Sequence, residues 1–516
     1  MGKVKSAIIT ALLVAAVAVL AFFATVSFGL PDGVKTYNSF VSNIHLGADL
    51  TGSAYAMLFP EGVISTADYQ LVVDDTENTD REDYEKKYVE RGGAYVRKDK
   101  LGYTYVDGNY IEPAEGDKTE SEFKESIKKD SEILLKRFGD KRYSSYSVLL
   151  CDDGYSIKVS VPTNFSYTEY KHNKETYSSD DLTEQISTVN VLSYSGGISL
   201  RDSNTFKDSK SLISVTSDFK SYFSGAGVYS RGGVNAITIS LTDYGFTELN
   251  NALNKYSGSE TSAYFYVGET CLGLSITIAD GVTDKTMFYQ PNNMSASAIQ
   301  DVAILLNSAI SGEEISNVYN DETENSGTSV IATTAVFGEY APVYLFAALL
   351  VVVVAAIVGP SIIYKKLGLV NALSVLIYSL AMVTAIMLID IQVTIAGAFV
   401  AILGLALLLF ANIVSFETIR KETLTGRTIQ ASVKLGYKKT IAAMLDLHIL
   451  LVIIAVMLTL IGVGEAASCG FIFFIAVLAS YVLHWFTRFM WFVTSSPVRD
   501  KFAFCGFARE VDDDED

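Results

Sequence analysis

The sequence has few of the residues that build metal centres and nucleophilic active sites. Among 516 residues there are four cysteines and four histidines, and no two histidines have the HExxH spacing of zinc proteases. The GxxxxGK phosphate-binding loop is also absent, so energy from nucleotide hydrolysis would have to come from another chain. No Ser-His-Asp arrangement is suggested. These absences argue against an enzyme, and we expect no cofactor and no metal.

The four cysteines have no spacing typical of a metal site or a redox pair. Cys151 and Cys271 lie in the polar middle of the chain. They are consistent either with a disulfide outside the cell or with two buried free thiols.

Long apolar runs are absent from residues 31–339. One run precedes this region, at residues 6–30, and five follow it, at 341–364, 368–389, 393–416, 441–462 and 470–493. A bilayer core roughly 30 Å thick needs about 20 apolar residues per helical span. The sequence therefore predicts a bundle of six transmembrane helices, with one large soluble domain between the first two. The first run is longer than the core of a usual signal peptide, although cleavage of such a peptide is the alternative.

Basic residues indicate the orientation of the bundle. Lys3 and Lys5 precede the first run, and the loops 365–366 and 417–439 are also basic, whereas the opposite turns hold only Asp390 and Glu465. Basic loops stay in the cytoplasm. We therefore expect a multi-pass plasma-membrane protein with both termini in the cytoplasm and the large domain outside.

Cations are scarce in the soluble region. The whole chain has a net charge of -18, and residues 31–339 alone carry about -20. This charge argues against binding to nucleic acid or anionic headgroups. We divide the chain into 1–30 (cytoplasmic start and first helix), 31–339 (extracytoplasmic domain), 340–495 (five-helix region) and 496–516 (acidic cytoplasmic tail).

The soluble domain has an α+β pattern, which we interpret as two small sheets backed by helices. Residues 121–138 have the spacing of an amphipathic helix, and strands are predicted at 146–150 and 156–161 around an Asp-Asp-Gly turn. A second unit has a strand at 234–241, a helix from Asp243, a hairpin around 268–269 and a helix at 295–310. Residues 74–118 look like an insertion, with a hairpin at 103–110.

The segment that follows the first helix reads LGADLTG, at residues 46–52. By itself it predicts the opening of a strand with a glycine bend. Its position is similar to that of the LGLDLxGG motif of the bacterial SecD family, with Gly47, Asp49 and Gly52 as the matching residues. Other segments resemble that family in the same order, at 132–161, 237–249 and 301–309.

The most specific resemblance is ANIVSFETIRKE, at residues 411–422, which is similar to the family's ANVLIFERIREE. It includes Asn412, Glu417 and Arg420. The later LDLH, at 445–448, is similar to the family's LDAN. The resemblance implies a SecD subunit of the RND superfamily, which acts with a SecF-like partner and the Sec channel on unfolded exported polypeptides and is driven by proton flow.

One position departs from the family pattern. Phe410 occupies the place of an acid thought to transfer protons, so Asp446 is the remaining proton-coupling candidate. The alternative is that Asp446 is an interfacial acid held by Lys438 or Lys439. An intramembrane carboxylate costs roughly 2.5–3.5 kcal/mol on insertion scales and is often functional.

Other polar residues of the bundle have simpler interpretations. We expect Asn412 to bond to a neighbouring helix, and Glu417, Arg420 and Lys421 to form a salt-bridged turn. We expect His448 to be a packed or hydrogen-bonded histidine, and His484 to face a partner subunit. Asp390 needs no special role.

The leading hypothesis is an accessory subunit of the secretion machinery that uses the proton motive force. An RND-type exporter of small molecules or lipids is the second hypothesis, although such exporters usually carry two six-helix halves. A scaffold subunit without proton coupling is the third.

Overall fold

The computed structural model describes the chain except for residues 1–2, 30–35, 75–80, 142–145, 164–182, 214–218, 232–233, 256–261, 278–281, 290–293, 320–329, 334, 336, 339, 463, 496–499 and 507–516. Six described helices are long and apolar enough to cross a membrane. They are α1 (Lys3–Thr25), α11 (Ala341–Tyr364), α12 (Lys366–Ile389), α13 (Ile395–Leu424), α14 (Ile429–Ile461) and α15 (Glu465–Ser495). The predicted six-helix membrane region is confirmed, and the chain is a multi-pass membrane protein.

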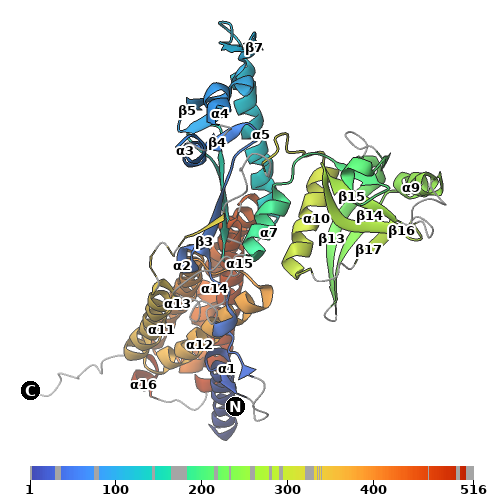
Figure 1. Cartoon of the computed structure of the whole chain (residues 1–516). Coiled ribbons are helices and arrows are strands. Elements are labelled where there is room, and N and C mark those ends of the chain that lie inside the picture. The colour runs from blue at the N-terminus through green and yellow to red at the C-terminus, as the bar shows by residue number, and fades with distance from the viewer. Residues whose placement is uncertain are drawn as a thin grey trace, which may run out of the picture.

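Helix α15 is central to the bundle, because it packs against α12, α13 and α14. One apolar cluster lies between α11, α12, α13 and α15 on the side of the soluble domain. A second cluster, which includes Phe416, Ile419 and Val433, lies at the opposite end. The soluble domain rises from one end of the bundle only (Figure 1).

The basic region 417–439 is helical instead of the predicted loop. Helix α13 continues to Leu424, and α14 begins at Ile429 after Thr428, whose hydroxyl accepts a hydrogen bond from the Ala431 amide. The two extensions pack closely, since a Cβ on Gly436 would lie 2.5 Å from Ile419. Apolar residues at helical spacing are buried along this hairpin, so the helices extend beyond the membrane-length run.

The start of the predicted acidic tail also has structure. Helix α16 (Lys501–Cys505) packs on α12 and α13, and Phe504 and Cys505 are fully buried. The acidic residues 512–516 lie outside the described part of the chain.

The soluble domain has two lobes. The stem lobe stands on the bundle and contains an antiparallel sheet in the order β18-β3-β10-β9. Helices α5 and α7 accompany this sheet (Figure 1). The elements are α2 (Ala48–Thr51), β3 (Ser53–Leu58), α5 (Thr119–Asp140), β9 (Ser147–Leu150), β10 (Ile157–Pro162), α7 (Thr183–Leu192) and β18 (Val330–Thr333).

The far end of the stem lobe holds the predicted insertion. It contains a three-stranded sheet and a separate hairpin, built from β4 (Val63–Ser65), α3 (Thr66–Asp74), α4 (Arg81–Lys87), β5 (Tyr88–Arg91), β6 (Ala94–Arg97), η2 (Lys98–Leu101), β7 (Thr104–Val106) and β8 (Asn109–Ile111). The hairpin predicted at 103–110 is confirmed. The unit begins earlier than residue 74, because β4 pairs with β6.

The side lobe projects beside the stem lobe (Figure 1). Its sheets have the orders β12-β11-β15-β16 and β13-β14-β17. Its elements are β11 (Ile198–Arg201), η4 (Phe206–Asp208), β12 (Ser211–Ile213), α8 (Phe219–Tyr222), β13 (Phe223–Arg231), β14 (Val234–Leu241), α9 (Asp243–Lys255), β15 (Ser262–Val267), β16 (Thr270–Thr277) and β17 (Thr286–Tyr289). Helix α10 (Ala296–Ile310) contacts both lobes.

The α+β class is confirmed, but the expectation of two small sheets is wrong. Four sheets of three or four strands are present in the described residues. Two two-stranded hairpins accompany them, one made of β7 and β8 and the other of β1 (Phe28–Gly29) and β2 (Thr36–Tyr37). Several of these strands are only three or four residues long and have no complete alternating pattern. Cys151 and Cys271 lie in different lobes as free thiols, so they form no disulfide.

Candidate functional site

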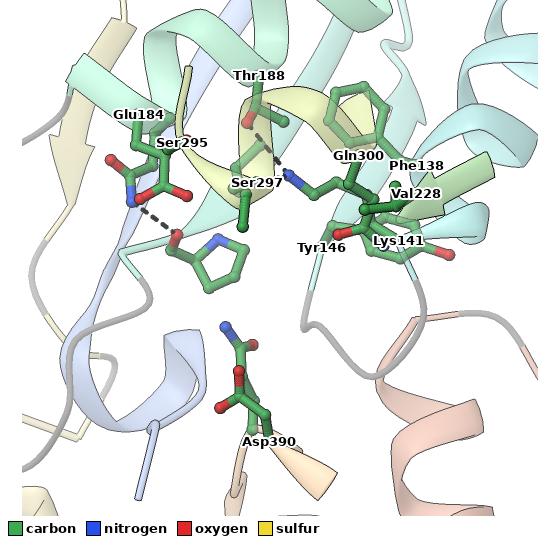
Figure 2. Close-up of a pocket in the computed structure, with 15 residues that line it drawn as sticks. Phe138, Lys141, Tyr146, Glu184, Thr188, Val228, Ser295, Ser297, Gln300 and Asp390 are labelled. Atoms are coloured by element: carbon green, nitrogen blue, oxygen red, sulfur yellow. Dashed lines mark hydrogen bonds between the residues drawn. The ribbon is translucent and has the colours of Figure 1, made fainter. Parts of the chain in front are cut away.

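A cleft of about 650 Å³ lies where the two lobes meet the membrane bundle. Its walls come from α5, β10, α7, β13 and α10, and its floor from the turn between α12 and α13 (Figure 2). The volume is within the range of ligand pockets. The lining residues are Phe138, Lys141, Tyr146, Val161, Pro162, Glu184, Gln185, Thr188, Val228, Ser295, Ala296, Ser297, Gln300, Asp390 and Gln392.

A buried ion pair supports one wall of the cleft. The Lys141 ammonium lies 2.7 Å from the Asp301 carboxylate and also donates to Thr188 and Ser297. Burial raises the pKa of Asp301, and the neighbouring Lys141 opposes that shift. The pair and its hydrogen bonds therefore hold the end of α5 against α7 and α10 beside the cleft.

The floor of the cleft joins the soluble domain to the bundle. Residues just after α1 pair with the α12–α13 turn, because the Val393 amide donates to the His45 carbonyl and the Gly47 amide donates to the Val393 carbonyl, each at 2.9 Å. The His45 ring also contacts the Asp390 carboxylate. This hydrogen bond lowers the pKa of Asp390. We call these contacts the junction.

Asp49 extends the junction to the start of α13. Its Oδ2 accepts a hydrogen bond of 2.6 Å from the Ile395 amide, and its Oδ1 is buried with no hydrogen-bond partner among the described residues. Burial raises the pKa of Asp49, although the Ile395 amide opposes this shift. This carboxylate accepts a hydrogen bond from a backbone amide in the first turn of α13, where helical amides have no partner within the helix. A negative charge is also favourable beside the positive end of the helix dipole.

The expected strand opening at residues 46–52 is therefore wrong in part. Gly47 precedes the helical turn α2, and Gly52 ends it with a φ of +94°. Strand β3 starts only at Ser53. Within this turn the Asp49 side chain reaches the start of α13.

Asn412 lies in a polar chain across the bundle core. Its amide nitrogen donates to Asn371 on α12 at 2.8 Å, and its oxygen lies 2.9 Å from Nδ1 of His484 on α15. All three residues are buried. His484 therefore faces the interior, and the expectation that it faces a partner subunit is wrong. His448 is also buried, 2.9 Å from the Ser480 hydroxyl.

Glu417 and Arg420 lie at the end of the bundle far from the soluble domain. The Arg420 guanidinium is 3.6 Å from the Glu417 carboxylate, and the Tyr364 hydroxyl donates to the same carboxylate at 2.8 Å. The residues thus link α13 to the end of α11.

Asp446 lies on the exposed face of α14 and does not point into the core. Lys439, one of the two cations suggested to hold it, instead lies 2.5 Å from Glu422. Phe410 is 52% exposed on α13. The structure therefore places neither position among the buried polar residues of this chain.

Three residues at or near the candidate site were not singled out from the sequence. Asp390 and His45 meet only in the tertiary structure, across 345 residues. Arg137 is fully buried and bonds to the backbone of both connections between the lobes. Its placement on the apolar face of the predicted helix 121–138 was the available signal. Among the described residues no cluster of His, Cys, Asp and Glu is placed to hold a metal ion.

The sequence is similar to SecD proteins over about a quarter of its length. It is 24% identical over 119 residues to "Protein translocase subunit SecD" of Aquifex aeolicus, covering 23% of this chain and 24% of that protein. It is 31% identical over 117 residues to the SecD of Magnetococcus marinus, covering 23% and 22%. A match to the SecDF of Bacillus subtilis has 25% identity and covers 25% and 19%. The chain is SecD-like.

A solved structure extends the similarity to the whole fold. The SecD-like chain matches a SecDF crystal structure in its super-membrane-facing form with a TM-score of 0.54 and 14% sequence identity. This match covers 96% of the chain and 59% of SecDF, so the chain spans about three fifths of that relative. No model of a known protein family matches the chain. The expected SecD-type architecture is confirmed by the fold and the sequence matches together.

Proposed function

We propose that this SecD-like chain is an accessory subunit of the Sec protein translocation machinery. It would promote export of polypeptides together with a SecF-like membrane protein and the Sec channel. The observation that carries the proposal is the junction, combined with the similarity to SecD. Asp49 and His45 tie the soluble domain directly to α13 and to the turn before it. A displacement of α13 would therefore reach the stem lobe and the cleft without an intervening flexible linker.

The orientation follows from the distribution of charge over the bundle. Lys365, Arg420, Arg427 and Lys439 lie at the end opposite the junction, where α16 also packs. By the positive-inside rule this end is cytoplasmic, and both lobes are outside the cell membrane. The cleft then opens on the side at which an exported polypeptide emerges.

The exposed face of α14 supports a membrane partner. Asp446 lies on this face near apolar side chains such as Ile449, Leu450 and Ile453, which are each at least half exposed. A carboxylate facing lipid costs roughly 2.5–3.5 kcal/mol, and a second bundle that covers it would remove that cost. We therefore place the SecF-like bundle on this face, with Asp446 as a proton-binding candidate at the interface.

A pull-down from the native membrane in mild detergent tests the assignment. Recovery of a SecF-like six-helix protein with channel components supports it. Recovery of this chain alone, as a homo-oligomer, contradicts it and favours an exporter. Depletion of the chain should also delay maturation of a signal-bearing secreted protein.

Replacing Asp446 tests proton coupling within this function. Asp446→Asn removes the titratable group but keeps its size, whereas Asp446→Glu keeps the acid and serves as the control. We expect the Asn variant to lose most of the proton-dependent gain in export while the Glu variant retains it. Equal export by both variants, with normal partner recovery, would favour the non-coupled scaffold.

A further inference from the structure

Strand β13 is an outer strand of its sheet, and one part of its free edge is closed. Among the described strands it pairs with β14 alone, on one side. On the other side, the Asn307 side chain of α10 binds both backbone groups of Ala226. Its Oδ1 accepts from the Ala226 amide at 2.8 Å, and its Nδ2 donates to the Ala226 carbonyl at 2.7 Å. Asn307 thus makes the two bonds that a neighbouring strand would make.

The pairing register shows where the edge stays open. Ala226 is opposite Ile239, and both Ala226 groups point away from β14. Backbone direction alternates along an antiparallel strand, so Val228 and Ser230 present their amides and carbonyls to the same outer side. No hydrogen bond of Val228 outside its own sheet is present in the described part of the chain. The edge is therefore closed at Ala226 and open at the two positions that follow.

Val228, one of the two open positions, lies at the cleft. Val228 is 44% exposed and is the residue of the side-lobe sheets that lines the cleft (Figure 2). Phe138 and Lys141 of the stem lobe also line the cleft, and its floor is formed by Asp390 and Gln392. The lining combines apolar side chains with charges of both signs. Such a surface selects weakly among side chains, whereas an unpaired strand edge binds any extended backbone.

We propose that the open edge of β13 binds a segment of extended polypeptide as an added antiparallel strand within the cleft. The proposal rests on the proposed function, because it supplies the contact through which an exported chain would be held. The added strand would accept from the Val228 amide and donate to its carbonyl, and would repeat this at Ser230. Asn307 would end the pairing at Ala226 and so set its register.

Binding of a defined peptide to the full chain in detergent tests the proposal. The probe is a fluorescein-labelled peptide of eight alternating valines and threonines between lysines, followed by fluorescence anisotropy. Val228→Pro removes the outward amide without breaking a bond to β14, whereas Val228→Ala removes the side chain and keeps the amide. Two lost or blocked backbone bonds predict at least about tenfold weaker binding for the Pro variant. We expect the Ala variant to bind within about threefold of the unmodified chain.

A second probe separates backbone pairing from other contacts. The same peptide with N-methyl groups on alternate residues lacks the backbone N–H donors along one edge of its strand. It should bind at least about tenfold more weakly than the unmethylated peptide. Thermal unfolding of the Pro variant within a few degrees of the unmodified chain verifies that the lobe stays folded. Equal binding of the two peptides, or equal binding by the Pro and Ala variants, would overturn the proposal. Pairing of β13 between two copies, seen as a dimer that Val228→Pro dissociates, would also overturn it.

The two proposals fail separately. Loss of peptide binding in Val228→Pro without any effect of chain depletion on export would reject the secretion role and keep the strand site. Delayed export on depletion, with peptide binding that is indifferent to Val228, would keep the secretion role and reject the strand site.

Discussion

The two lobes of the soluble domain are held together in different ways. Buried polar side chains are numerous in the stem lobe and in α10, where they include Asp130, Arg137 and Asp301. Over the described residues of 198–289, which form the side lobe, the buried side chains are apolar. Polar networks fix one arrangement through directional bonds, whereas an apolar core tolerates changes at its rim. Directional bonds thus fix the stem lobe, whereas the side lobe is held by apolar packing.

Arg137 is the clearest example of this difference. Its guanidinium donates to the Leu192 and Tyr194 carbonyls, each at 2.9 Å, where the chain leaves the stem lobe. It also donates to Ser308 and to the Glu313 carbonyl, where the chain returns. Burial lowers the pKa of Arg137 to about 10, so it remains charged at neutral pH. A single side chain therefore binds both connections between the lobes.

Removing the Arg137 side chain should have the largest effect of the predicted changes. It would disrupt the buried polar network that distinguishes the stem lobe from the side lobe. Arg137→Met leaves several carbonyls buried without a donor, at about 1–3 kcal/mol each, so we expect a loss of at least about 3 kcal/mol in stability. The loss should appear in thermal unfolding, and limited proteolysis should cut near residues 193–197 and 311–315.

Arg137→Lys is the matched control, since it keeps the charge but makes fewer directed bonds. We expect it to fall between the unmodified chain and the Met variant. Resistance of the Met variant to proteolysis at both connections would show that other contacts hold the lobes.

A smaller effect is expected at the junction, where Asp49 caps α13. Asp49→Ala leaves the Ile395 amide without its acceptor and should cost about 1 kcal/mol in thermal unfolding. Asp49→Asn keeps an acceptor of the same shape. The pKa of Asp49 in the folded chain is raised above its ordinary value of 3.8. The favourable contribution of Asp49 to folding stability is therefore fully present below pH 3.8, and it is lost as the pH rises through the raised pKa.

The Asn variant should therefore be at least as stable as the unmodified chain at pH 7, and this difference should shrink when the pH is lowered. A cost for Asp49→Asn equal to that of Asp49→Ala would contradict the capping geometry. It would indicate that the charge itself stabilises the junction.

The smallest effect is expected at the exposed contact between Asp390 and His45. The pKa of Asp390 is lowered, so the contact stabilises the junction above the ordinary carboxyl value of 3.8 and is lost as pH falls through the lowered pKa. Asp390→Asn should lower the unfolding temperature slightly at pH 7 and have no effect at a pH below the lowered pKa of Asp390. A constant difference at both pH values would exclude the titration of Asp390 as its cause. High salt should reduce the effect at pH 7.

Many elements were predictable because their signals are local. The length and position of the apolar runs predicted the six long apolar helices, since a helix that spans the membrane requires an uninterrupted apolar run. Strand β14 and helix α10 follow from period-two and helical patterns, and Ser295, the first residue of the predicted helix, is the N-cap of α10. The helical extension to Leu424 was not predicted, because its charges resemble those of a loop until Ile419 and Gly436 are seen to pack together.

The candidate site was predictable only in part. The segment around Asp49 was chosen for its resemblance to SecD, and the structure gives it a role in capping a helix that begins 346 residues later. Asp446 was chosen as an intramembrane acid, but only the packing of α14 shows that it faces outward. The roles of Arg137 and Asn307 depend on carbonyls and amides of distant segments, which leave no pattern in the sequence.

The sequence by itself determined the membrane spans, the acidic soluble domain and the order of most helices and strands. These properties depend on the length of apolar runs, on charge and on the short repeat spacing of apolar residues. All three can be read from residues that are neighbours in the sequence. Only the tertiary structure decided how the soluble domain joins the bundle, where the cleft lies and which strand edge stays open. These features depend on single hydrogen bonds between segments hundreds of residues apart, and such bonds exist only when the chain is folded.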